Sequence, residues 1–401
     1  MEIAVIGSGA SGLVSAIESA KLGNNVTVLE RLNDFGKKIL VTGNGKCNYW
    51  NEDFSNKHFY SSNYSFIKEV NTEENRKAVL KFFKNIGIVP TIKNGYYYPM
   101  SKEASSIRNA LLEKAKDNNV KFINDANVNT INKIDNKFYI KYKNKKLVVD
   151  KVIIATGSKS YYKEDAIGYS LCKKLGHNII KVMPSLVQLV GDEPFFKEWK
   201  GGRNNSVVSI LVDNKKIKEE TGEIMLTDYG VSGICIFNLS GIASRALNEN
   251  KKVEININFI PEIKDANSFF DKRETILKNR SLDEFLEGII NYKLANIIIK
   301  RCHLSKSNTW SNLNKQEKNN IIENLTNFKL NIKSTEDFSK SQVCTGGVDT
   351  SEINSKTMES KKCKGLFIVG EILDVDGDCG GYNLGFAWLS GLLAGRSVNS
   401  D

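Results

Sequence analysis

Three glycines near the amino end of the chain, Gly7, Gly9 and Gly12, form a G-x-G-x-x-G motif in the segment GSGASG. In such a motif the first glycine permits a tight turn, the second lets a pyrophosphate approach the backbone, and the third allows close packing of helix on strand. The helix that follows would direct its N–H groups and positive dipole toward the phosphates. Glu30 stands 23 residues after Gly7, near the offset of about 20 at which a carboxylate accepts ribose hydroxyls. This spacing predicts a dinucleotide site.

Two later segments favour FAD over NAD as the dinucleotide. The run IIATG at 153–157 looks like the A-T-G segment that crosses near the dinucleotide in flavoproteins with two dinucleotide-binding folds. The run GLFIVGEILDVDGDCGGYNLGFA at 365–387 resembles a strand ending at a Gly-acid pair on the ribitol, followed by a helix that points at the flavin. A helix N-terminus there would stabilise the negative charge at N1 and O2 of the reduced flavin.

The elements around these motifs follow an α/β pattern that is interrupted once. Residues 2–30 read as strand, helix and strand, which requires a parallel sheet. Helices are expected at 73–86 and 102–117, strands from 120 to 157, a β-rich region that can close as a barrel from about 185, and helices from about 264 to 326. The expected division starts with the first part of the FAD domain (1–186), which is followed by a β-rich substrate domain (187–262) and a helical insertion (263–328). A return segment (329–339) then leads to the second part of the FAD domain (340–401).

The chain resembles a family of bacterial flavoproteins that includes aminoacetone oxidase and a bile-acid Δ4,6-reductase. The resemblance rests on GKKILVTGNGKCNYWN (36–51), GYYYPMSKEASSI (95–107), GEIMLTDYGVSG (222–233) and the segment 344–387, and it spans nearly the whole chain. It implies an α/β protein with a Rossmann-like FAD domain split in sequence, an inserted β-rich, barrel-like domain and a small helical domain.

The motifs and the resemblance together give a set of expected cofactor-binding residues. The resemblance implies that a polar loop lines the cofactor and that Val128 supplies the backbone contact to adenine; the loop residues are Lys37, Thr42, Gly43, Asn44, Cys47 and Asn48. The motifs add Gly7, Gly9, Ala10, Ser11, Gly12, Glu30, Arg31, Ala155, Thr156, Gly157, Gly370, Glu371, Asp374, Gly380, Gly381, Tyr382 and Asn383.

Two positions depart from the patterns of the family and the wider superfamily. Lys46 stands where the family usually has arginine, and lysine lacks the bidentate fork that suits phosphate, so Lys46 is not included among the ligands. Glu371 replaces the aspartate common in the wider superfamily, and Asp374 is expected to share or take over its contact with the ribitol.

The sequence assigns no catalytic residue, and Tyr98, Tyr382 and Cys47 are candidates only. Cys47 has no near neighbour among the seven scattered cysteines, which disfavours a dithiol relay unless Cys344 or Cys379 comes close in space. The three histidines form neither a metal-binding nor a catalytic-triad pattern, and His177 is expected to cap the end of a helix. No metal site is expected.

The predicted function is hydride transfer between flavin N5 and a small organic substrate. The direction stays open: an NAD(P)H-dependent reductase of a conjugated double bond, or an amine oxidase. Because the sequence shows no second G-x-G-x-x-G motif after a strand, NAD(P)H would visit the open flavin face transiently as the reductant. A flavin-binding sensor without turnover ranks last, since no partner domain is evident.

The formal net charge of +11, from 57 Lys and Arg against 46 Asp and Glu, raises an alternative of another class. A tRNA-modifying flavoprotein that acts on nucleic acid would use such a charge. The lysines are spread along the chain, and the densest patch, 137–151, reads as a hairpin with solvated lysines, so nucleic acid is not the favoured partner. No membrane span, leader or disulfide framework is expected, the expected location is the cytoplasm, and the oligomeric state is open.

Overall fold

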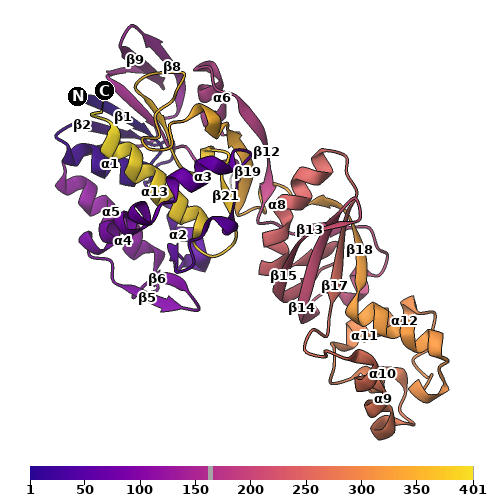
Figure 1. Ribbon diagram of the computed structural model, residues 1–401. Helices are drawn as coiled ribbons and strands as arrows, with labels where there is room; N and C mark the ends of the chain where they lie inside the picture. Colours follow the sequence, from indigo (N-terminus) through magenta and orange to yellow (C-terminus); the bar gives the residue numbers. More distant parts are fainter. Residues whose placement is uncertain (161–165, 401) are drawn as a thin grey trace. The chain divides into compact units, whose positions relative to one another are not determined.

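A computed structural model describes residues 1–160 and 166–400 of the protein. The chain forms two compact units, the first from Met1–Val182 with Val343–Asp401 and the second from Met183–Gln342. The first unit is therefore assembled from both ends of the chain (Figure 1). The further division of the second unit into a β-rich part at 187–262 and a helical part at 263–328 stays a prediction.

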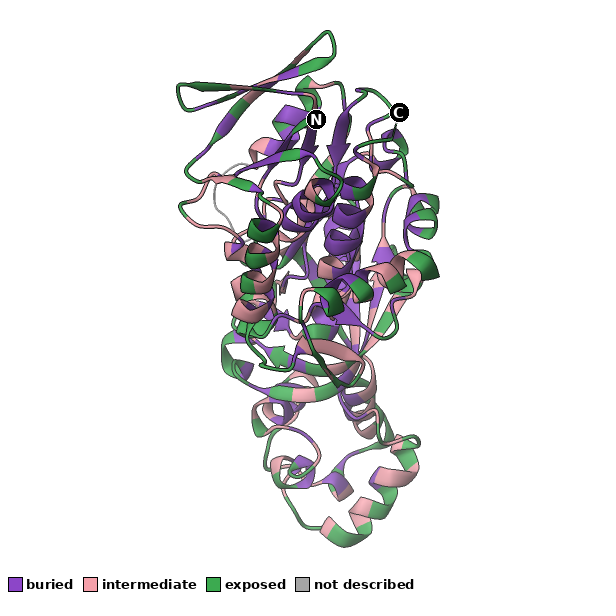
Figure 2. Ribbon diagram, turned by 90° about the vertical axis from the view of Figure 1, so that its left-hand side faces the viewer, coloured by how far each residue is buried: buried purple, intermediate pink, exposed green. Residues whose placement is uncertain are grey.

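A five-stranded parallel sheet forms the centre of the first unit, in the order β20-β11-β1-β2-β7. Its strands are rich in valine and isoleucine, and the three central ones are almost wholly buried, as a sheet covered on both faces requires (Figure 2). They are β1 (Glu2–Ile6), β2 (Asn25–Leu29), β7 (Lys121–Ile123), β11 (Lys151–Ile154) and β20 (Leu366–Ile368). The predicted strand-helix-strand unit at the amino end is confirmed.

The helix α13 (Tyr382–Ser397) packs against α1 (Ala10–Lys21), although the two are far apart in sequence (Figure 1). Two small residues permit the close approach. A Cβ on Gly391 would lie 2.5 Å from the Ser11 carbonyl oxygen, and one on Gly395 would lie 2.7 Å from the Ser15 carbonyl oxygen. The apolar side chains around them are buried, so this helix pair ties the end of the chain to its beginning.

The remaining elements of the first unit are short helices and small antiparallel sheets. The helices expected at 73–86 and 102–117 are confirmed as α4 (Glu73–Asn85) and α5 (Ala104–Asp117). The other helices are α2 (Lys37–Val41), α3 (Tyr64–Val70), α6 (Ile167–Lys174) and the 3-10 turns η1 (Thr42–Gly45), η2 (Asn56–His58), η4 (Thr350–Glu352) and η5 (Gly370–Ile372). The small sheets are β10-β9-β8, β3-β6-β5, β21-β4 and β12-β19.

The sheet β10-β9-β8 contains the lysine-rich hairpin that the sequence predicts. Its strands are β8 (Val128–Ile134), β9 (Lys137–Tyr142) and β10 (Lys145–Val149), and Lys141, Lys145 and Lys146 are exposed. The strands of the other small sheets are β3 (Trp50–Asn51), β4 (Phe59–Tyr60), β5 (Pro90–Lys93), β6 (Tyr96–Pro99), β12 (Ile179–Ser185), β19 (Val343–Val348) and β21 (Asp376–Gly377).

The second unit contains a closed antiparallel barrel in the order β13-β16-β15-β14-β17-β18, which confirms the expected barrel. Its strands are β13 (Leu189–Gly191), β14 (Arg203–Val212), β15 (Lys215–Leu226), β16 (Gly230–Ser232), β17 (Val253–Asn258) and β18 (Phe328–Thr335). The helix α8 (Ile234–Asn248) lies between β16 and β17 in sequence and buries Ile236, Leu239 and Ala243.

The strand β18, which closes the barrel between β17 and β13, comes after the helices at 266–326 in the sequence. Phe328, Leu330 and Ile332 alternate with exposed residues and complete the barrel, so the helices between β17 and β18 form an insertion within it. The helices of the second unit besides α8 are α7 (Phe196–Trp199), α9 (Ala266–Leu277), α10 (Leu282–Leu286), α11 (Tyr292–Arg301), the turn η3 (Trp310–Asn312) and α12 (Lys315–Thr326). In the described ranges, no helix combines the length and apolar character needed to cross a membrane.

A buried polar cluster joins the end of α6 to η4. The His177 N–H donates to the Cys172 carbonyl, which confirms the predicted cap at the level of the backbone. Its buried ring lies between Glu352 (Nδ1 to Oε2, 2.9 Å) and Ser360 (Nε2 to Oγ, 2.8 Å). A neutral ring satisfies both contacts, with Nδ1–H donating to Glu352 and Nε2 accepting from the serine hydroxyl. Burial lowers the pKa of His177, and the Glu352 hydrogen bond offsets only part of this shift.

This lowered pKa gives the stability of the protein a defined pH dependence. Below its ordinary value of about 6.5 the unfolded chain binds a proton at His177 that the folded protein resists, so the free energy of unfolding decreases as the pH falls. The contribution of this one group has a slope of at most about 1.4 kcal/mol per pH unit. Urea denaturation between pH 5 and pH 7 should show a shallower slope for His177→Gln than for the wild type. The exposed His303→Gln is the control, and equal slopes for all three proteins would contradict the assignment.

Candidate functional site

The turn between β1 and α1 has the geometry of a phosphate cradle. Gly7 adopts φ +100°, and its N–H donates to the Leu29 carbonyl at 2.8 Å. A Cβ on Gly12 would lie 2.1 Å from the Gly7 carbonyl oxygen, so only glycine allows α1 to start here. A Cβ on Gly9 would meet nothing within 4 Å among the described residues, and no side chain caps α1 at this residue. Ala10 and Ser11 follow in the first turn of the helix. Open space thus lies at a helix N-terminus, as a bound pyrophosphate requires.

Glu30 lies at the end of β2 beside this cradle, as the sequence predicts. Its Oε2 accepts hydrogen bonds from the Ser8 N–H (2.8 Å) and hydroxyl (2.7 Å), and its Oε1 accepts from the Leu32 N–H (3.0 Å). These bonds fix the carboxylate next to the glycine-rich turn, where it can accept ribose hydroxyls. Arg31 follows it, and Val128 is buried at the start of β8, next to an irregularity in the strand register.

Two buried polar atoms, one in the segment after β11 and one in α6, are left without a hydrogen-bond partner by the described residues. The Thr156 hydroxyl and the Tyr169 hydroxyl are buried and have no hydrogen-bond partner among the described residues. Ala155 is buried and Gly157 has φ +69°. Buried polar groups in folded proteins are almost always paired, so an orphaned hydroxyl such as that of Thr156, in a segment already expected at the cofactor, fits a site built for a polar ligand. These residues therefore fit FAD.

The Gly370–Glu371 pair follows β20 and meets the amino end of α1. A Cβ on Gly370 would lie 2.4 Å from the Ser11 hydroxyl oxygen. The Glu371 carboxylate accepts hydrogen bonds from the Ser158 hydroxyl (2.7 Å), the Ser160 hydroxyl (2.9 Å) and the Lys38 ammonium (2.7 Å). The part-buried ion pair with Lys38 was not predicted.

Lys37 and Lys38 are neighbours in α2, and their side chains have different partners. The expected ligand Lys37 donates to Asn33 at 2.6 Å in an exposed contact, whereas Lys38 reaches Ser160 and Glu371. The structure thus brings Lys38, and not Lys37, together with the predicted ribitol residue. Asp374 is buried, and its carboxylate accepts from the Ser62 N–H at 2.9 Å.

The loop 42–48 winds tightly, because four of its residues have positive φ. Gly43, Asn44 and Cys47 adopt φ near 55° and Gly45 adopts φ +79°, and the Cys47 N–H donates to the Thr42 carbonyl. Lys46 is exposed. The Asn48 amide nitrogen can donate to the carbonyls of Trp50 (2.9 Å) and Tyr97 (3.2 Å).

All seven cysteines are free thiols, and Cys47 is fully buried. Burial raises the pKa of the Cys47 thiol to about 12, and a hydrogen bond with Thr42 offsets only part of this shift. The thiol is therefore protonated at neutral pH, and this disfavours Cys47 as a nucleophile or redox group because the thiolate is the reactive form.

Cys47 is accordingly expected to resist alkylation. In native protein at pH 8, iodoacetamide should leave Cys47 unmodified, whereas in urea it should react fully because burial is lost. Peptide mass spectrometry provides the measurement, and the half-exposed Cys379 is the internal control. Modification of native Cys47 as fast as Cys379 would restore it as a catalytic candidate.

The amino end of α13 is the second helix terminus of the site. Gly381 is the residue that precedes the helix, at φ +91°, and as a glycine it supplies no side-chain cap. A Cβ on Gly381 would lie 2.8 Å from an atom of the Asn48 side-chain amide, and one on Gly380 would lie 2.9 Å from the Tyr96 ring. The predicted residues Gly380, Gly381 and Asn48 therefore lie together, as does Tyr96, which was not predicted.

The two tyrosine candidates lie in different surroundings. Tyr382 is buried, with its ring among Phe54, Phe59 and His58. Tyr98, on β6, is half-buried, and burial together with the neighbouring Tyr96 raises its pKa. Asn383 anchors the preceding loop, since its side chain accepts from the Gly377 N–H (2.9 Å) and donates to the Gly377 carbonyl (2.7 Å).

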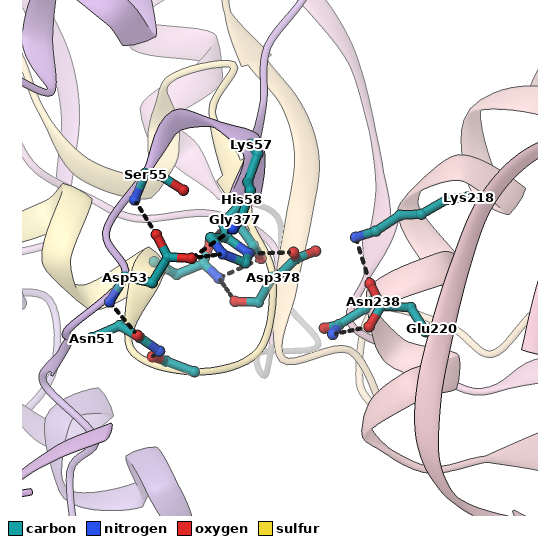
Figure 3. A network of polar contacts seen from close by, with 12 residues as sticks. Asn51, Asp53, Ser55, Lys57, His58, Lys218, Glu220, Asn238, Gly377 and Asp378 are labelled. Carbon is teal, nitrogen blue, oxygen red and sulfur yellow. Dashed lines mark hydrogen bonds and ion pairs between the residues drawn. The ribbon is translucent and has the colours of Figure 1, made fainter. Parts of the chain in front are cut away.

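Sequence reasoning missed His58, whose ring contacts two carboxylates (Figure 3). Asp378 lies far along the chain in the loop before α13, so no local pattern could have joined it to His58. In the described residues, no group of three His, Cys, Asp or Glu side chains is arranged to hold a metal ion.

The fold and this site define a Rossmann-type flavoprotein with a split cofactor unit and an inserted barrel. The chain belongs to the family described as "HI0933-like protein Rossmann domain", whose model matches residues 1–397. The prediction of an FAD-dependent oxidoreductase of this family is confirmed at this level.

Curated relatives match the chain from end to end. It is 35% identical to the 3-dehydro-bile acid delta(4,6)-reductase of Clostridium scindens, over 99% of this chain and 98% of the relative. It is 25% identical to the ribosomal RNA dihydrouridine synthase of Escherichia coli, over 96% of this chain and 95% of the relative. Among solved structures, 3-ketosteroid-delta4-(5alpha)-dehydrogenase from Rhodococcus jostii covers all of this chain and 97% of its own, with 14% identity and a TM-score of 0.48.

Proposed function

We propose that the protein reduces a carbon–carbon double bond conjugated to a carbonyl group in a small organic molecule. The observation that carries this proposal is the 35% identity, over nearly the whole of both chains, with a relative named as a bile-acid delta(4,6)-reductase. We also propose that NAD(P)H is the reductant and that it visits the site only transiently. The proposed location is the cytoplasm, as expected from the sequence.

The residues of the chain have definite tasks in this reaction. The first turn of α1 and the open space at Gly9 would hold the pyrophosphate, and Glu30 would hold the adenosine ribose. FAD bound there would supply hydride transfer at N5. The N-terminus of α13, where Gly381 supplies no side-chain cap, would stabilise the negative charge of the reduced flavin. The ring pair Trp50–Phe54, with centroids 3.9 Å apart, is buried and excludes water from this end of the helix.

Anaerobic stopped-flow spectroscopy of the purified holoprotein tests the proposal in two steps. NADH or NADPH should bleach the flavin absorbance, and a 3-keto-4-ene or 3-keto-4,6-diene steroid should then restore it. A non-conjugated 3-keto steroid is the matched control and should leave the flavin bleached. Bleaching by small amines but not by either nicotinamide would replace the reductase with an amine oxidase.

A second substrate class has a specific observation in its favour. The relatives of Escherichia coli and Haemophilus influenzae, at 25% and 27% identity, are named as ribosomal RNA dihydrouridine synthases. Uracil also holds a carbon–carbon double bond conjugated to a carbonyl, so the chemistry is the same and only the substrate differs. The exposed Lys141, Lys145 and Lys146 of the hairpin could contact phosphates.

The same reduced protein distinguishes the two substrate classes. If the substrate is a small molecule, ribosomal RNA should not reoxidise the flavin at any salt concentration. If the substrate is RNA, the reoxidation rate should fall steeply with salt, and neutral substitution of the three hairpin lysines should lower it at low salt.

A further inference from the structure

His58 is held at both ring nitrogens by carboxylates from different parts of the first unit. Nδ1 lies 3.0 Å from Asp378 Oδ2, in the loop before α13, and Nε2 lies 3.2 Å from Asp53 Oδ2 (Figure 3). The His58 ring stacks on Tyr382, with centroids 4.4 Å apart and planes 19° apart. Only about a fifth of the His58 side chain is exposed, compared with 15% for Asp378 and 51% for Asp53.

These contacts suit the charged form of the ring. A neutral imidazole has one N–H, so one of its nitrogens would direct a lone pair at a carboxylate oxygen, whereas the imidazolium donates to both. Asp53, Asp378 and Lys57 are among the charged groups around it, and Lys57 pairs with Asp53 at 2.7 Å. The pKa of Asp53 is lowered, mainly by Lys57 and then by Ser55 and His58, so this carboxylate stays ionised at neutral pH.

His58 also anchors the loop 377–381, which leads directly into α13. The Asp378 N–H donates to the His58 carbonyl at 2.9 Å, and Gly377 pairs with Phe59 in the small sheet β21-β4. At its far end the loop is held by Asn51, whose amide donates to the Gly380 carbonyl at 2.9 Å. Because Gly381 supplies no side-chain cap for α13, this loop sets where the first N–H groups of the helix lie.

We propose that His58 is a positioning residue that clamps loop 377–381, and so holds the N-terminus of α13 in the geometry that receives the flavin. The inference rests on the FAD site of the proposed function but not on its substrate.

The test measures FAD release from purified holoprotein on dilution, by the fluorescence of the released flavin, and records the visible absorbance spectrum of the flavin that stays bound. His58→Phe keeps an aromatic ring on Tyr382 but loses both polar contacts. Its FAD dissociation constant should rise about tenfold, equivalent to ~1.4 kcal/mol, and the absorbance bands of its bound flavin should shift from those of the wild type.

Matched variants keep the result interpretable. His303→Gln removes an exposed histidine and should follow the wild type. Asp378→Asn retains the ring and the shape of the loop, so it carries the test if His58→Phe does not fold, and the same loss of affinity and the same spectral shift are expected. Wild-type affinity and a wild-type flavin spectrum in either clamp variant would overturn the inference. No substrate enters the assay, so failure of the proposed reaction would leave this result unaffected.

Discussion

Gly9→Ala is expected to remove tight FAD binding while the fold stays intact. The backbone of Gly9 has φ −72°, which alanine adopts readily, and the added methyl group would meet no atom of the described residues within 4 Å. That open space is where the pyrophosphate must approach α1, so the methyl group would collide with the cofactor and not with the protein. We expect the FAD dissociation constant to rise at least 100-fold, which is about 2.7 kcal/mol. Equilibrium dialysis measures the affinity, and urea denaturation of FAD-free protein measures the stability.

Gly12→Ala is the matched comparison, because it adds the same methyl group three residues later. There the new atom would lie 2.1 Å from the Gly7 carbonyl oxygen, so the protein itself must move. Overpacking of this kind typically costs ~1–3 kcal/mol, and the free energy of unfolding of the FAD-free protein should fall by at least that amount. If Gly9→Ala bound FAD as tightly as the wild type, the pyrophosphate could not lie at this turn.

Glu352→Ala is expected to lower the free energy of unfolding by about 3–5 kcal/mol. The Glu352 side chain is only 7% exposed. It accepts from the His177 ring (2.9 Å), the Asn178 N–H (3.0 Å) and the Asn178 amide (2.8 Å), and it pairs with Lys362. Its removal leaves several donors, one of them a cation, without an acceptor. Thermal or urea denaturation of the variant measures the loss.

Two controls separate the lost hydrogen bonds from the lost charge. Glu352→Gln keeps an acceptor but removes the charge, so its loss should lie between those of the wild type and the alanine variant. Glu74→Ala, at an exposed position in the first turn of α4, should change stability by less than about 1 kcal/mol. A loss for Glu352→Ala as small as that for Glu74→Ala would show that the cluster does not stabilise the fold.

The parts of the site that the sequence predicts are those determined by short-range geometry. The G-x-G-x-x-G motif, with Glu30 at the end of the next strand, specifies a strand-turn-helix-strand unit in which Glu30 accepts from Ser8, 22 residues before it. The short apolar runs at 3–6, 152–155 and 366–369 likewise predict buried strands of a parallel sheet. Each of these signals lies within about 30 residues of sequence, and the structure confirms the fold they define.

What the sequence does not predict depends on contacts between distant segments. Lys37 and Lys38 are identical in type and adjacent in a short helix, and only the position of Glu371 selects Lys38 as its partner. His58 gains its role from Asp378, which belongs to the other end of the chain. Buried and exposed residues alternate along β18, which is enough to predict a strand. That this strand pairs with β13 and β17 and so closes the barrel is seen only in the structure.

The split of the first unit has a consequence during synthesis. The cradle at Gly7–Gly12 leaves the ribosome first, but the strand β20 beside β11 and the helix α13 against α1 are made last. Chains are synthesised at ~5–20 residues per second, so tens of seconds pass between these events. During this time α1 lacks the helix that buries its apolar face. The nascent amino-terminal half therefore exposes apolar surface that α13 buries in the folded protein. A stop codon that removes only the last twenty residues, and with them α13, should send nearly full-length chains to degradation.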